Sequence, residues 1–138
     1  MDRPAPARFP VTRLAAVDGV ALVAFVAVGM LQHGEGVDLT VFMRTGLPLL
    51  GAWFLLAPLL GTYRRWGWVT LVLTWAAAVP AALVVRSLVR GGPWGSGLLQ
   101  FGAVAMAFTL LFLIVGRLLV LLAGWFRDRQ RRGSLEPR

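Results

Sequence analysis

The sequence contains no cysteine and no lysine, and it has one histidine and one tyrosine among its 138 residues. Without cysteine there can be no disulfide, no thiolate metal site and no cysteine nucleophile. One histidine is too few to form a metal site alone. There is also no Ser/His/Asp arrangement in a plausible order, no glycine-rich loop for phosphate and no pair of carboxylates within an apolar run. We therefore expect neither an enzyme nor a bound cofactor or metal.

Acidic residues are scarce as well, since the chain has 6 acids against 14 basic residues and a formal net charge of +8. Nucleic-acid binding would need that charge to be gathered on a folded polar face. The arginines stand instead at the ends of apolar runs, so we expect no nucleic-acid partner. With 58% hydrophobic and 14% charged residues, the chain has too little polar surface for a soluble globule of this size. It is expected to form one integral membrane domain.

Long apolar runs dominate what is present. A run of about 20 apolar residues crosses a hydrocarbon core of about 30 Å as a helix. We predict an all-α fold, a bundle of four transmembrane helices surrounded by the lipid bilayer. The expected spans cover about residues 14–32, 45–62, 68–88 and 98–120.

The ends of the chain are predicted to lie outside this membrane domain, which covers residues 14–126. The fourth run stays apolar as far as residue 126, so we expect its last turns to emerge from the bilayer. Residues 1–13 are rich in proline and residues 127–138 are charged. Both terminal segments are expected to be disordered.

The distribution of arginine predicts the orientation in the membrane. Eleven of the 14 arginines fall at the N-terminus, in the turn between the second and third runs, or at the C-terminal end. The two other loops together have three. Because loops rich in arginine stay in the cytoplasm, we expect a multi-pass protein of the cell membrane with both termini cytoplasmic.

Asp18 is the acid that lies within an apolar run, five residues after Arg13 and therefore about 7 Å into the first helix. An ionised carboxylate is costly at that depth unless water, a partner or the bundle interior receives it. Three interpretations are open. Asp18 could be solvated by headgroup water at the interface, it could pair with Arg117, which reaches the same depth from the fourth run, or it could be a proton or substrate site.

The helical period predicts which face of the first helix turns towards the bundle. At about 100° per residue, one stripe contains Asp18, Leu22, Phe25, Gly29 and Gln32. We expect this stripe to face the neighbouring helices.

A second polar patch is predicted on the opposite side of the membrane from Asp18. The histidine ends the first run there, and an acid and three arginines reach the same level. The candidate residues are His33, Glu35, Arg44, Arg86 and Arg90. The commoner explanation for the histidine is that it caps the end of its helix, where the negative end of the helix dipole attracts positive charge.

Several short motifs follow one another along the chain. They are the acid, glycine and terminal His-Gly of LAAVDGVALVAFVAVGMLQHGEG, then Arg44-Thr45-Gly46-Leu47-Pro48, Gly51 with Trp53, Arg86-x-Leu88-x-Arg90-Gly91-Gly92, and Phe101-x-x-Val104 leading to Gly116-Arg117. In their order and spacing the chain resembles, over about residues 13–120, a prokaryotic membrane family catalogued as domain of unknown function 3054. That family has no established activity, so the resemblance implies an architecture and no mechanism.

These observations favour a small multi-pass membrane protein of unknown molecular activity with a structural or accessory role. We expect a homo-oligomer, because four short spans leave little room for a pathway within one copy. The alternative is a small oligomeric transporter or channel that uses Asp18 as a proton-coupled or cation site. Small multidrug exporters share four spans and an acid in the first, whereas the glycine-arginine signature of four-spanning fluoride channels is missing. A haem or quinone binder would rest on one histidine and some tryptophans.

Overall fold

The computed structural model describes residues 11–32, 38–64, 67–90 and 96–133, which contain four α-helices and no strand. The helices are α1 (Val11–Gln32), α2 (Leu39–Leu59), α3 (Trp68–Arg90) and α4 (Ser96–Gly133). Each is long and apolar enough to cross a membrane. The predicted all-α bundle of four membrane-spanning helices is confirmed.

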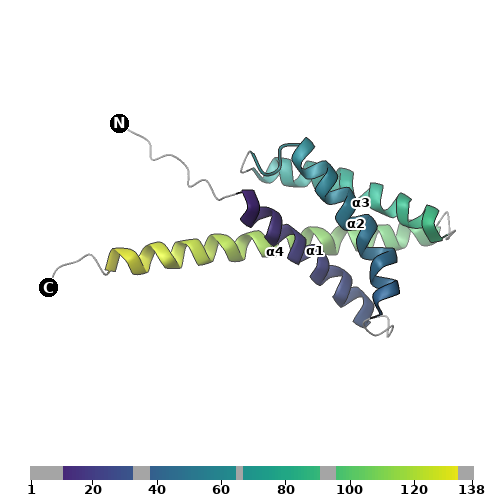
Figure 1. Ribbon diagram of the computed structural model, residues 1–138, viewed down its shortest axis with the longest axis horizontal. Helices are drawn as coiled ribbons and strands as arrows, with labels where there is room; N and C mark the ends of the chain where they lie inside the picture. Colours follow the sequence, from purple (N-terminus) through teal and green to yellow (C-terminus); the bar gives the residue numbers. More distant parts are fainter. Residues whose placement is uncertain (1–10, 33–37, 65–66, 91–95, 134–138) are drawn as a thin grey trace.

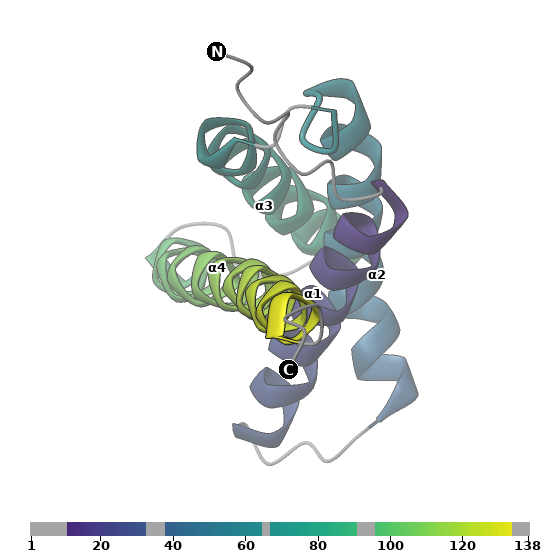
Figure 2. The same ribbon diagram turned by 90° about the vertical axis from the view of Figure 1, so that its left-hand side faces the viewer.

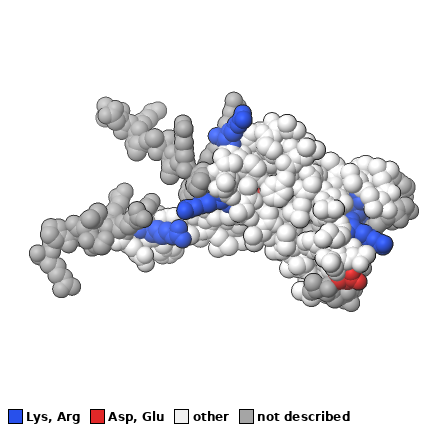
Figure 3. Space-filling view, viewed as in Figure 1, with Lys and Arg blue, Asp and Glu red and all other residues white. Residues whose placement is uncertain are grey.

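The four helices form a ring in chain order. α1 and α3 each pack against both α2 and α4, while the described residues show no contact between α1 and α3 or between α2 and α4. Consecutive helices run in opposite directions, so α1 begins and α4 ends on the side where α2 turns into α3 (Figure 1). Figure 2 shows the ring from that side, with the end of α4 towards the viewer. Charged side chains gather towards the two ends of the molecule, and an uncharged band separates them (Figure 3).

α2 begins six residues before the predicted start at residue 45. Asp38 caps the helix, because its Oδ1 accepts a 2.6 Å hydrogen bond from the backbone N–H of Thr40. A capping carboxylate of this kind satisfies a backbone donor at the helix N-terminus. The stretch left between the first two predicted spans, residues 33–44, is therefore too long, since helical turns form before the apolar run begins.

α2 also ends earlier than predicted, at Leu59 instead of near residue 62. Gly61 has a φ of 73°, a left-handed conformation that glycine adopts without the steric cost of a Cβ atom. The N–H of Thr62 then donates a 2.9 Å hydrogen bond back to the carbonyl of Ala57. This turn reverses the chain, so that residues 62–64 return towards the side of α2.

α4 corrects the prediction for the C-terminal segment. The helix has 38 residues, which makes it about 57 Å long, and it extends well beyond the other three (Figure 1). Residues 127–133 are therefore helical instead of disordered. Arginine and glutamine favour helix, and basic side chains near a helix C-terminus interact well with the helix dipole. Residues 11–13 likewise belong to α1, and the rest of both predicted terminal segments lies outside the described residues.

The buried face of α1 matches the predicted stripe at Asp18 and Leu22 and differs from it at the other three residues. Phe25 and Gly29 are partly exposed, and Gln32 is exposed. Apart from Ala21, the buried residues of α1 follow a spacing of four: Leu14, Asp18, Leu22, Val26 and Met30. Residues four apart form a ridge inclined to the helix axis. α1 crosses α4 obliquely (Figure 1). The residues that enter the interface therefore form a ridge inclined to the α1 axis, and not a stripe parallel to that axis.

Candidate functional site

Asp18 on α1 and Arg117 on α4 form an ion pair inside the bundle. The Arg117 Nε–H donates to Asp18 Oδ1 at 3.1 Å, and the Nη2–H donates to Oδ2 at 2.8 Å. The Asp18 side chain has 0% of its surface exposed and that of Arg117 has 3%. Of the three interpretations given for Asp18, the structure contains the pair with Arg117, and solvation by headgroup water does not fit a side chain without exposed surface.

The two-pronged geometry uses both carboxylate oxygens and fixes the orientation of one helix against the other. Glycines beside both charged residues permit the close packing around them. A Cβ atom on Gly116 would lie 3.1 Å from Cγ1 of Val17, and a Cβ atom on Gly19 would lie 3.2 Å from Cζ of Phe54. A larger residue at position 116 would push α4 away from α1 and so weaken the contact that the ion pair needs, whereas the exposed Phe54 ring can move aside for a Cβ atom at position 19.

Two aromatic side chains complete the arrangement around Asp18. Trp53 Nε1–H donates a 3.0 Å hydrogen bond to Tyr63 Oη, and both side chains lie close to the Asp18 carboxylate. Burial, and secondly the negative charge of Asp18, raise the pKa of Tyr63 to about 12. The phenol therefore stays protonated, and its O–H can donate a hydrogen bond. We call Asp18, Trp53, Tyr63 and Arg117 the polar cluster.

The sequence pattern does not indicate that Trp53 and Tyr63 are partners of Asp18. Trp53 is completely buried in the middle of α2, and the turn at Gly61 brings Tyr63 back to it across ten residues. One signal was available. Tyr63 is the only tyrosine in the chain, and it follows α2 at the end of the bundle where Asp18 and Arg117 also lie.

The remaining helix contacts also contain buried polar side chains. Between the end of α2 and α3, the hydroxyls of Thr62 and Thr74 share a hydrogen bond. Between α3 and α4, Trp75 Nε1–H donates to the Met106 carbonyl at 3.0 Å and to Thr109 Oγ1 at 3.1 Å. Polar side chains thus join α1 to α4, α3 to α4, and the turn after α2 to α3. Such contacts matter within a membrane, because the hydrophobic effect does not draw helices together there.

The structure describes only part of the predicted outer patch. His33 and Glu35 lie outside the described residues, as does the side chain of Arg90. Arg44 is exposed on α2, and the guanidinium of Arg86 on α3 lies 4.3 Å from the centre of the Phe101 ring. The patch therefore stays a prediction. Within the described part of the chain, no group of three or more His, Cys, Asp or Glu residues could hold a metal ion.

No curated protein and no solved structure matches this chain. A family model does match, and its description is protein of unknown function (DUF3054). The match covers residues 15–120 and so includes all four members of the polar cluster. The resemblance seen in the order of the sequence motifs is confirmed. The chain belongs to the DUF3054 family of proteins of unknown function.

Proposed function

We propose that this chain is a small membrane protein with a structural or accessory role, in which the ion pair of Asp18 and Arg117 holds α1 against α4. One observation carries this proposal: both oxygens of a completely buried carboxylate are bonded to a single guanidinium. Together the two groups are close to neutral, and breaking the pair would leave an uncompensated charge in an apolar interior. An ion-coupled transporter needs an acid that exchanges its ion during turnover, which this pairing opposes.

A transport role is the alternative, with Asp18 as the proton-coupled or cation site. The observation that favours it is the position of Tyr63, which belongs to the turn after α2, accepts a hydrogen bond from Trp53 and lies close to Asp18. A phenol placed there could relay a proton between the carboxylate and that end of the bundle. Such a role would require a homo-oligomer, because one copy has little room for a pathway.

Proton flux separates the two roles. The purified protein is reconstituted into liposomes that contain a pH indicator, a pH gradient is imposed, and sodium, potassium, guanidinium or tetraphenylphosphonium is added. For a structural role we expect the proton leak of protein-free liposomes, both for the wild type and for Asp18→Asn. Asp38→Asn changes an exposed acid at the other end of α2 and is the matched control. A flux that Asp18→Asn abolishes and Asp38→Asn retains would replace the structural role by transport.

We further propose that both termini face the cytoplasm and that the membrane is the cell membrane. The start of α1, the turn between α2 and α3 and the end of α4 share one side of the bundle (Figure 1). By sequence position, eleven of the 14 arginines fall at or before the start of α1, between α2 and α3, or from Arg117 onwards, and the positive-inside rule assigns such a side to the cytoplasm.

Because the chain has no cysteine, single cysteines can report the orientation without a background. Thr12 and Thr40 are exposed near the starts of α1 and α2, on opposite sides of the bundle. In spheroplasts treated with a membrane-impermeant maleimide, we expect Thr40→Cys to be labelled at once and Thr12→Cys to be labelled only after the membrane is permeabilised. The reverse pattern would show that the termini face outward.

A further inference from the structure

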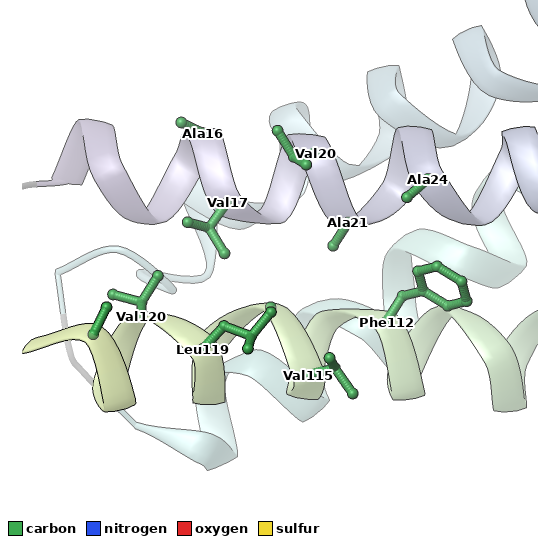
Figure 4. A pocket seen from close by; sticks show the side chains of 11 residues that line it. Ala16, Val17, Val20, Ala21, Ala24, Phe112, Val115, Leu119 and Val120 are labelled. Atoms are coloured by element: carbon green, nitrogen blue, oxygen red, sulfur yellow. The ribbon is translucent and has the colours of Figure 1, made fainter. Parts of the chain in front are cut away.

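An apolar groove runs between α1 and α4 on the outside of the bundle. It has a volume of about 480 Å³, which lies in the range of sites that hold small molecules. Figure 4 shows Val17 and Ala21 of α1 on one side and Phe112 and Leu119 of α4 on the other. The groove opens outward, because Val20 and Leu119 of its lining are 70% and 61% exposed. In a membrane it would therefore open towards lipid.

The groove belongs to the half of the bundle near the start of α1 and the end of α4. Its lining runs from Ala16 to Ala24 on α1 and from Phe112 to Ala123 on α4. The two helices are antiparallel, and their close contact at Val17 and Gly116 sets their register. The groove therefore has an apolar floor within one leaflet and ends near the interface of that leaflet.

Arginines continue the lining of the groove at this interfacial end, one on each helix. Arg13 precedes Ala16 by three residues and Val17 by four, and Arg127 follows Ala123 by four. Residues three or four apart share one face of a helix. Both arginines are exposed. In the sequence, Asp128 follows Arg127, but three further arginines, at positions 129, 131 and 132, outnumber this acid at the same end of α4. Among the described side chains, the acids are Asp18, which is hydrogen-bonded to Arg117, and Asp38 at the other end of the bundle. The mouth of the groove is therefore positive.

The two arginines can reach a common ligand. With Val17 beside Gly116, Arg13 lies level with residue 120, and Arg127 is about 10 Å farther along α4. Side chains on a helix lean towards its N-terminus. That tilt carries Arg13 away from the bilayer and carries Arg127 back towards it. Guanidinium groups that converge from two helices match a phosphate, which they can bind through several hydrogen bonds.

We propose that the groove between α1 and α4 binds one anionic phospholipid, with an acyl chain along the groove and its phosphate between Arg13 and Arg127. The charge of the groove mouth decides between possible occupants. A second copy of this chain would bring the same arginines to the same place and would be repelled, whereas a zwitterionic lipid would gain less than one with a net negative charge.

Native mass spectrometry of the delipidated protein in detergent tests this proposal. The protein is titrated with phosphatidylglycerol or with phosphatidylcholine that has the same acyl chains. We expect the first lipid to bind with a preference for phosphatidylglycerol on the order of tenfold, because each arginine near a membrane surface favours anionic lipid. The double variant Arg13→Gln/Arg127→Gln should remove this preference. Arg129→Gln should keep it, since Arg129 lies 5.0 Å from the centre of the Trp125 ring and outside the groove.

A second pair of variants tests the groove itself. Ala24→Phe places a large side chain in the groove and should weaken the binding of both lipids, whereas Ala81→Phe changes an exposed alanine of α3 and should weaken neither. Equal binding of the two lipids by the wild type would overturn the proposal, as would a preference that survives the double arginine variant. Loss of a dimer in Ala24→Phe without loss of bound lipid would assign the groove to a second copy.

Discussion

Arg117→Gln alone is expected to lower the free energy of unfolding by roughly 3–5 kcal/mol, because it leaves the Asp18 carboxylate buried without a countercharge. Asp18→Asn should lower the free energy of unfolding by a similar amount, because it leaves the Arg117 guanidinium buried without a countercharge. In the double variant, two neutral amides can hydrogen-bond to each other and neither buries a charge. We therefore expect the double variant to be more stable than either single variant.

The measurement is a double-mutant cycle based on reversible unfolding in mixed micelles, since residues in direct contact show large coupling free energies. Arg64→Gln is the control, because Arg64 is exposed at the end of the same half of the bundle. It should change stability by less than about 0.5 kcal/mol. If the double variant were no more stable than the less stable of the two single variants, this result would contradict a structural role for the pair.

Trp53→Ala is expected to lower the free energy of unfolding by roughly 3–5 kcal/mol, the usual range for truncating a large buried aromatic side chain. Trp53 has no exposed surface, and its indole N–H bonds Tyr63 beside the ion pair. Trp53→Phe keeps most of the apolar contact and removes the hydrogen bond. It should therefore have the smaller effect, about 1 kcal/mol for the hydrogen bond.

The same unfolding assay measures both Trp53 variants. Trp125→Ala is the matched control, because Trp125 is a tryptophan of α4 with 54% of its surface exposed. We expect this control to unfold nearly as the wild type does. If Trp125→Ala were as destabilising as Trp53→Ala, the loss could not be assigned to the polar cluster.

The polar cluster couples the effects that the Trp53 and Asp18 variants have on stability. Asp18, Arg117 and Trp53 come from three different helices, and Tyr63 joins them from the turn that Gly61 makes possible. Removing Trp53 withdraws the donor that fixes the position of the Tyr63 phenol. The effects of changing Trp53 and Asp18 should therefore be non-additive, as expected for residues of one hydrogen-bonded network.

The sequence by itself determined the class of the protein, the number of helices and their antiparallel order, because the length and hydropathy of each run are local properties. It also placed Asp18 and Arg117 at the same depth, since depth follows from counting residues along a helix. The order of the motifs was enough to identify the family. Contact between residues at equal depth was not determined, because the rotation of each helix about its axis depends on how it crosses its neighbours.

Only the tertiary structure decided which side chains meet. The buried ridge from Leu14 to Met30 shares Asp18 and Leu22 with the predicted stripe and replaces its other members, and the packing of α1 on α4 sets Asp18 against Arg117. A turn with a positive φ at Gly61 brings Tyr63 to the cluster, and a capping contact at Asp38 starts α2 early. Each of these depends on where one element lies relative to another. A hydropathy pattern carries no information about that relation, because it records only the depth of each residue.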